Sequence, residues 1–243
     1  METAPELWIG KTPQEVAREA ARRIKNLLTH AITETGRASF ILSGGTTPVR
    51  LFQLLALESQ IPWDAVSIWW VDERWVPLDH TDSNFALAHR HLLSHVPISP
   101  HHIVSIDTSL PPGEAIPSYT RLLQEQFSHH GPDVVLLGMG ADGHTASLFP
   151  GNPILRVASD AWCLFIPDAP KPPRQRVTWT PRLINTAANV IVLATGAEKA
   201  SALSAAIESD ALPQEIPIRA IHPDRGHLIW LADQTAAGAL RLP

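Results

Sequence analysis

One stretch, Gly138 to Gly151, holds side chains whose types and spacing suit acid–base chemistry. The apolar run 134–137 before it predicts a buried strand, and three glycines let the backbone then turn tightly and approach a ligand. Asp142 and His144 follow at once. Because functional groups of open parallel sheets gather where the strands end, we expect this acid and this imidazole to lie in a site.

Two other interpretations of the stretch are possible. The spacing of Gly138, Gly140 and Gly143 matches a dinucleotide-binding fingerprint, and Asp160 lies near the position of an acid that would hold a ribose hydroxyl. Only six residues separate Gly143 from Pro150, however, which leaves no room for the long helix that would hold a pyrophosphate. A plain strand-to-loop turn with a solvated histidine is the second alternative. We favour a site in which His144 takes part.

A second turn, Ser43 to Pro48, is suited to an anion. It follows the strand predicted at Ala38–Leu42, and Thr47 can cap a helix that runs from Val49 to about Leu57. Free backbone N–H groups, hydroxyls and the helix dipole all favour a phosphate. The turn lacks the lysine of a P-loop, so a nucleoside triphosphate is not implied. A capped turn without a ligand stays open as the alternative.

Charged residues at other predicted element ends could serve the same site. Asp72-Glu73-Arg74 directly follows the strand predicted at 66–71, as a site or a solvated strand end would. Lys199 lies in the first turn of the helix predicted from Ala197 to about Glu208, where its charge opposes the helix dipole unless an anion joins it. A proline-rich loop contributes three further cations, Lys171, Arg174 and Arg176.

Two histidines raise the question of a metal. His91 and His95 are one turn apart on the helix predicted from Asn84 to about Leu93, which Asp82 or Ser83 would cap. No nearby acid or HExxH pattern supports a metal there, so a surface helix is the favoured interpretation.

The remaining elements must hold these groups in place. Pro13 and a capping box at Thr12–Glu15 predict a helix that runs to Gly36. The other expected elements are a strand at Ile103–Ile106, a helix from about Ala115 to Phe127 with Pro117 in its first turn, strands at Trp162–Ile166 and Asn189–Ala194, the segments Ile218–Ile221 and His227–Ala232, and a short helix from Asp233. Strands alternate with helices throughout, which predicts an α/β fold with a mainly parallel sheet covered on both faces.

Composition limits the possible partners. The 243 residues show no linker, so one domain spanning residues 1–243 is expected. A net charge of −5 offers no general attraction to nucleic acid, and an anionic ligand must therefore be held by local cations. No apolar run approaches ~18 residues and the first residues do not resemble a signal peptide, so no membrane partner and a cytoplasmic location are expected. The single cysteine, Cys163, lies in an apolar run typical of a buried, inert thiol.

Six motifs, in order, resemble the 6-phosphogluconolactonases, a family within the broader group that includes glucosamine-6-phosphate deaminases. They are Ser43–Pro48, Val71–Arg74, Ser83–Phe85, Gly138–Gly151, Arg176–Thr178 and Gly196–Ala200. The resemblance implies a Rossmann-like three-layer fold, no metal or nucleotide cofactor, and hydrolysis of 6-phospho-D-glucono-1,5-lactone in the oxidative pentose phosphate pathway. The deaminases typically have Asp-Glu-Tyr in place of Asp72-Glu73-Arg74 and a glutamate within 147–150. Because lactone hydrolysis does not need that acid, the lactonase interpretation is favoured.

The resemblance also implies roles for individual residues. His144 would activate a water, Asp142 would orient the imidazole, and Arg74 would stabilise the negative charge that develops. The phosphate-binding and supporting residues would be Ser43, Gly44, Gly45, Thr46, Asp72, Arg176 and Lys199, with Asp72 a partner of Arg74. The division of roles among the three cations stays open. A small-molecule lactone and a monomer or weak homodimer are expected. A non-catalytic sugar-phosphate sensor is the alternative of a different class, although such proteins usually carry a DNA-binding module and no basic N-terminal module is present.

Overall fold

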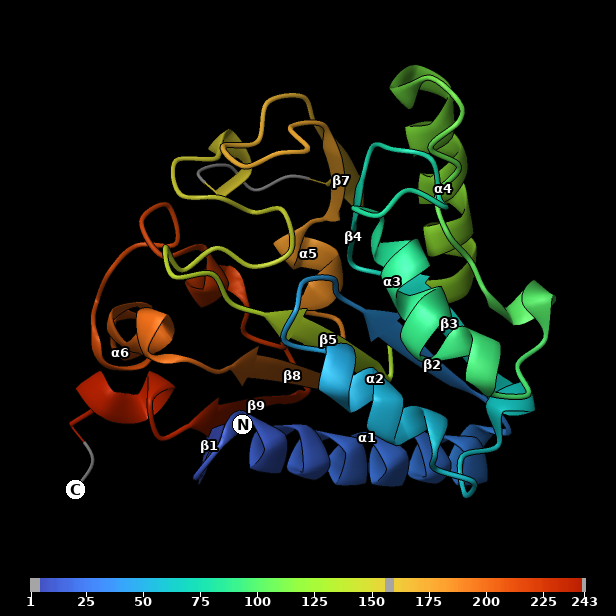
Figure 1. The fold of residues 1–243 in the computed structure, drawn as a ribbon. Coiled ribbons are helices and arrows are strands. Elements are labelled where there is room, and N and C mark those ends of the chain that lie inside the picture. Colours follow the sequence, from blue (N-terminus) through green and yellow to red (C-terminus); the bar gives the residue numbers. More distant parts are fainter. Residues whose placement is uncertain (1–4, 156–159, 242–243) are drawn as a thin grey trace.

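A six-stranded sheet forms the centre of the molecule (Figure 1). The computed structural model describes residues 5–155 and 160–241, and all pairings within this sheet are parallel. In spatial order its strands are β1 (Glu6–Gly10), β9 (His227–Asp233), β8 (Asn189–Ala194), β5 (Val134–Gly138), β2 (Ala38–Leu42) and β3 (Val66–Trp70). The prediction of a mainly parallel sheet is confirmed.

Helices cover both faces, because neighbouring residues of a strand point to opposite sides. One apolar core includes Phe40 of β2 and buries residues of α1 (Pro13–Thr35), α2 (Val49–Ala56) and α3 (Asn84–His91). The other core includes Ile41 and buries residues of α4 (Pro112–Phe127), α5 (Pro181–Ile184) and α6 (Ala200–Glu208). Figure 1 shows α1 and α2 on one side of the sheet and α4 and α5 on the other. The three-layer architecture is confirmed.

A second, antiparallel sheet joins the α4 side. Its strands, in spatial order, are β4 (Asp72–Arg74), β7 (Arg176–Trp179) and β6 (Cys163–Ile166). Val71 connects β3 directly to β4, and its carbonyl accepts a hydrogen bond from the backbone N–H of Trp179 at 2.7 Å. The charged run 72–74 therefore lies on a strand of its own that faces the carboxyl end of the parallel sheet.

The order of the strands locates the site. From β2 the chain proceeds outward to β3, whereas from β5 it proceeds the opposite way to β8 and β9. Ligand clefts of open α/β sheets form at the carboxyl ends of the strands where this direction reverses. Here the reversal falls between β2 and β5, which are followed by the Ser43 turn and the glycine loop.

The local predictions succeeded unevenly. The helix at 13–35 is confirmed, with Thr12 accepting from the Glu15 N–H at 3.3 Å and Gly36 in the left-handed region at φ 79°. Ser83, not Asp82, caps α3. Two other predictions were wrong: Ile103 makes only an isolated bridge to Ile68, and the last helix is a 3₁₀ turn at Ala236–Ala239. The segment expected at 218–221 forms a 3₁₀ turn at Pro217–Ala220. The strand expected at 162–166 and the helix expected from about Ala115 are present, but Cys163–Ile166 belongs to the second sheet and α4 begins earlier, at Pro112, so that Pro117 lies beyond its first turn.

Candidate active site

A cleft of about 190 Å³ lies at the carboxyl ends of β2, β3, β5 and β8. Asp142 is the one predicted site residue that does not line it, and it contacts His144, which does. The predicted residues that line the cleft are Ser43, Gly44, Gly45, Thr46, Asp72, Arg74, His144, Arg176 and Lys199. Groups that are more than 150 residues apart in the chain thus share one small cleft.

His144 and Asp142 form a hydrogen-bonded dyad through Nδ1 and Oδ1. An ionised carboxylate can only accept, so Nδ1 carries the hydrogen and Nε2 is left as a proton acceptor. The pKa of His144 is lowered, with burial as the largest cause, although the hydrogen bond and charge of Asp142 act in the opposite direction. Burial raises the pKa of Asp142, but the hydrogen bond and charge of His144 bring it down to about 2. Near neutral pH the dyad is therefore a neutral imidazole beside a carboxylate.

Backbone hydrogen bonds close the glycine loop at 140–144 into a tight turn. The Gly140 N–H donates to the His144 carbonyl at 2.8 Å, and the Gly143 N–H donates to the Gly140 carbonyl at 3.0 Å. A Cβ on Gly140 would lie 2.0 Å from His144 Nδ1 and 2.4 Å from Asp142 Oδ1, and Gly143 has a φ of 76°. Two of the three glycines thus have a steric or conformational requirement.

Asp72 is buried at the base of the cleft and its partners are uncharged. Its Oδ2 accepts from Ser147 Oγ at 2.8 Å and its Oδ1 from Asn84 Nδ2 at 3.3 Å. The expected pairing with Arg74 is absent from the ion pairs of the described residues; Arg74 Nη1 instead donates to the Asp82 carbonyl at 2.7 Å. Asp72 therefore contributes one carboxylate to the cleft, and Arg74 is not ion-paired with it.

Glu73 has a structural task that the charged run did not suggest. Its buried carboxylate accepts from the backbone N–H groups of Asn84 and Phe85 at 2.7 and 2.8 Å and from Ser83 Oγ at 3.0 Å. It thereby fixes the beginning of α3 against β4. Asn84 was not among the predicted site residues, but it lines the cleft, and a Cβ on Gly44 would lie 1.8 Å from its Oδ1.

The anion-binding turn differs from expectation in one detail. Pro48 occupies the N-cap position of α2 and no side chain caps that helix, so the proposed capping by Thr47 was wrong. Ser43 is buried and Gly45 has a φ of 88°. Lys199 ends a 3₁₀ turn at Ala197–Lys199 just before α6, with its Nζ 3.9 Å from a Glu198 carboxylate oxygen.

Arg176 is buried and faces the cleft from β7. Its Nε donates to the Pro173 carbonyl at 2.8 Å, and its guanidinium lies 5.8 Å from the centre of the Phe149 ring. Burial is the main cause that lowers the pKa of this guanidinium. With Arg74 and Lys199 it gives the cleft three cationic side chains against the single lining carboxylate of Asp72, an electrostatic arrangement that favours an anionic ligand.

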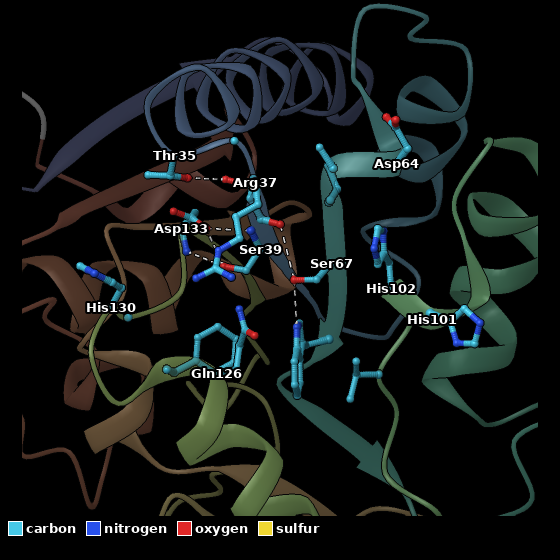
Figure 2. Close-up of a pocket in the computed structure, with 18 residues that line it drawn as sticks. Thr35, Arg37, Ser39, Asp64, Ser67, His101, His102, Gln126, His130 and Asp133 are labelled. Carbon is cyan, nitrogen blue, oxygen red and sulfur yellow. Dashed lines mark hydrogen bonds between the residues drawn. The ribbon is translucent and has the colours of Figure 1, made fainter.

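A larger cavity of about 720 Å³ lies at the opposite, amino ends of β2, β3 and β5 (Figure 2). Figure 2 shows Arg37 and His130 on one side of it and Asp64, His101 and His102 on the other. Asp133 accepts from both the N–H and the hydroxyl of Ser39 at 2.7 Å. Among the described residues, the lining of this cavity contains one arginine and no lysine against two aspartates, so it lacks the excess of arginine and lysine side chains that the cleft has.

Metal ligation gains no support from the arrangement of side chains. Within residues 5–155 and 160–241, no group of three histidine, cysteine or acidic side chains has a metal-binding arrangement. α3 ends at His91, and His95 lies in a 3₁₀ turn with Nε2 3.1 Å from the Arg90 carbonyl, so the two histidines do not share one helix. No helix in these ranges is both long enough and apolar enough to cross a bilayer.

Comparison with known proteins gives a consistent result. A family model described as glucosamine-6-phosphate isomerases/6-phosphogluconolactonase matches residues 11–230. The chain belongs to this family. Among curated members, a probable 6-phosphogluconolactonase 1 of Arabidopsis thaliana is 37% identical, covering 97% of this chain and 93% of that protein. The 6-phosphogluconolactonase of Synechocystis sp. is 38% identical, covering 98% and 99%.

Solved structures of the family share the fold. The 6-phosphogluconolactonase from Trypanosoma brucei matches with a TM-score of 0.85 and 29% identity, covering 98% of this chain and 99% of that one. A monomeric glucosamine-6-phosphate deaminase matches with a TM-score of 0.81 but 18% identity, which shows only a common fold. The resemblance inferred from six motifs is thus confirmed at the level of family and fold.

Proposed function

We propose that this chain is a 6-phosphogluconolactonase that hydrolyses 6-phospho-D-glucono-1,5-lactone to 6-phospho-D-gluconate, the second step of the oxidative pentose phosphate pathway. The observation that carries the proposal is the meeting of the Asp142–His144 dyad and the Ser43–Thr46 turn in one cation-lined cleft. Similarity to lactonases over nearly the whole chain supports it. The proposal includes action as a single sugar-phosphate-binding domain, in the cytoplasm, as a monomer or weak homodimer.

The dyad supplies the base for water attack. Nε2 of His144 takes a proton from water as the water oxygen bonds to the lactone carbonyl carbon. Asp142 stabilises the resulting imidazolium and keeps its ring orientation. Arg74 stabilises the tetrahedral oxyanion through its planar, positively charged guanidinium. When the bond from that carbon to the ring oxygen breaks, the imidazolium returns the proton to this oxygen, and the new carboxylic acid loses its proton to solvent.

The remaining polar groups bind the phosphate. Hydroxyl and backbone donors of Ser43 to Thr46 meet it from one side, and Lys199 and Arg176 contribute positive charge from the other. This explains why a lysine stands at the beginning of a helix, since the phosphate supplies the negative charge that this helix end favours. Binding of the phosphate holds the lactone carbonyl in a fixed position relative to His144, so part of the binding energy serves to orient the reacting groups.

The test is acid release from freshly prepared lactone in a pH-stat, with spontaneous hydrolysis subtracted. The His144→Ala variant should lose about 10²–10⁴-fold in kcat while it binds 6-phosphogluconate nearly as well as the parent. His130→Ala, in the cavity at the opposite end of the sheet, is the control and should keep parental activity. Full activity of His144→Ala would remove this imidazole from the mechanism. Ammonia release from glucosamine 6-phosphate in place of lactone hydrolysis would instead identify a deaminase.

A further inference from the structure

Lys171, which does not line the cleft, contacts both residues of the Asp142–His144 dyad. Lys171 lies in the loop between β6 and β7, with its Nζ 3.3 Å from Asp142 Oδ2 and 3.4 Å from His144 Nδ1. The other oxygen of Asp142 accepts from the imidazole and, at 3.3 Å, from the backbone N–H of His144. The carboxylate thus has donors on both oxygens, and Lys171 is the donor at Oδ2.

The loop that carries Lys171 is anchored from beneath by Arg176. Besides its bond to Pro173, the buried guanidinium donates through Nη2 to the carbonyls of Lys171 and Pro172 at 3.1 and 3.2 Å. Across the loop, the Ala169 N–H donates to the Arg174 carbonyl at 2.8 Å. Half of the Lys171 side chain is exposed, so burial does not hold the ammonium in place. The anchored backbone is what directs it toward Asp142.

We infer that Lys171 is a positioning residue for His144: its ammonium fixes the carboxylate of Asp142 so that one oxygen receives the Nδ1 hydrogen and Nε2 stays the proton acceptor. The terminal torsion of an aspartate has a broad, roughly two-fold preference, so donors on Oδ1 alone leave the plane of the carboxylate loosely held. A donor on Oδ2 fixes that plane. The catalytic meaning of this inference rests on the proposed function, because it concerns the same imidazole.

Lys171 also balances the charges that face His144. Besides burial, which lowers the pKa of His144, the nearby carboxylates of Asp142 and Asp72 raise it and the ammonium of Lys171 lowers it. The cleft itself contains three further cations, Arg74, Arg176 and Lys199, which remain when Lys171 is replaced. Removing Lys171 should therefore raise the pKa of His144 and move the acid limb of the kcat/KM profile to higher pH.

The experiment compares Lys171→Met, Lys171→Arg and Arg174→Met in the full chain. Arg174 is a matched control, since it is an exposed cation of the same loop that pairs with Asp168 and not with the dyad. We expect Lys171→Met to lower kcat about tenfold or more with little change in KM, and to shift the acid limb upward. Lys171→Arg should recover most of both properties, and Arg174→Met should match the parent.

Other outcomes would overturn the inference. A raised KM with unchanged kcat would make Lys171 a binding residue, and a lower Tm with no shift of the acid limb would make it a merely structural one. Titration of the His144 imidazole by NMR, in the parent and in Lys171→Met, does not depend on activity; an unchanged pKa there would also overturn the inference. A parent chain inactive toward the lactone would refute the proposed function, and the titration would still decide the role of Lys171.

Discussion

The dyad depends on a residue that has no side chain. Gly140 lies directly against His144 and Asp142, and its own N–H binds the carbonyl of His144. Sequence reasoning identified the glycines as permissive for a turn, and the two catalytic candidates were predicted from type and spacing. It did not select Lys171, because the contact of this lysine with Asp142 depends on a loop that Arg176 anchors. The sequence shows that Lys171 is a cation, but it does not show that the ammonium contacts Asp142.

Replacing Gly140 by alanine should displace the dyad without unfolding the protein. A Cβ at this position would lie 2.0 Å from Nδ1 of His144, which is too close for any atom, so the imidazole must move. Misplacement of a reacting group by about 1 Å can cost roughly 10²-fold in rate, and we expect a loss of kcat of this order. Gly113→Ala, where a Cβ would contact nothing within 4 Å, is the control and should keep parental kcat. Equal kcat in the two variants would contradict the steric argument.

The pH profile should report the environment of His144. A general base must be neutral, and burial lowers the pKa of this imidazole. The acid limb of kcat/KM should consequently lie below the ordinary histidine value of about 6.5 and appear as pH falls through the lowered pKa. Asp142, with a pKa of about 2, stays ionised over this range and adds no second limb. An acid limb above the ordinary histidine value would contradict the assignment.

Elements defined by local signals were predictable, and those defined by distant pairing were not. The capping box and Gly36 fixed the ends of α1, since capping groups lie within a few residues of the helix. The run 162–166 has the composition of a strand, but nothing local shows that Cys163–Ile166 pairs with β7 in a separate antiparallel sheet. The strand β1 was missed because its five residues, at the edge of the sheet, carry no clear alternation of buried and exposed side chains.

Glu73 links β4 to the beginning of α3, so a neutral side chain at this position should destabilise the attachment of α3. Glu73→Gln keeps the size of the side chain. Its amide NH₂ would face N–H or hydroxyl groups that now donate hydrogen bonds to the carboxylate, and two donors cannot bond to each other. We expect a loss of about 1–3 kcal/mol in the free energy of unfolding, measured by denaturant titration, and a higher KM because Asn84 lines the cleft. Glu114→Gln, on the exposed first turn of α4, should change stability by less than about 0.5 kcal/mol. Similar losses in both variants would argue against a special role for Glu73.

Across the whole molecule, the two ends of the parallel sheet differ in charge. The carboxyl end gathers Arg74, Arg176 and Lys199 around one carboxylate, whereas the larger cavity at the amino end has one arginine, three histidines and two aspartates. The alternation of strands and helices predicted the layers, and the position after each strand predicted which side chains would meet. The volumes of the two cavities and the route of the loop 167–175 depend on tertiary packing that no local pattern contains.

Ligand-linked stability should show which end binds the product. At about one hundred times its Kd, 6-phosphogluconate should stabilise the parent by roughly 2.7 kcal/mol and raise its Tm accordingly. Lys199→Met should require a higher concentration for the same shift, and gluconate, which lacks the phosphate, should give almost none. His130→Ala serves as the control at the amino end. An equal Tm shift from gluconate would show that the phosphate contributes nothing.

The close fit of Asn84 against the backbone of Gly44 constrains how this chain can vary. Any side chain at position 44 would overlap the Asn84 amide, and that amide also donates to the carbonyl of Asp72 at 2.8 Å. Neither position can change alone without disturbing the turn, the helix and the buried acid together. Homologues that have gained a methyl group at one of the two should therefore have lost volume at the other, and the pair should covary although forty positions separate them in the sequence.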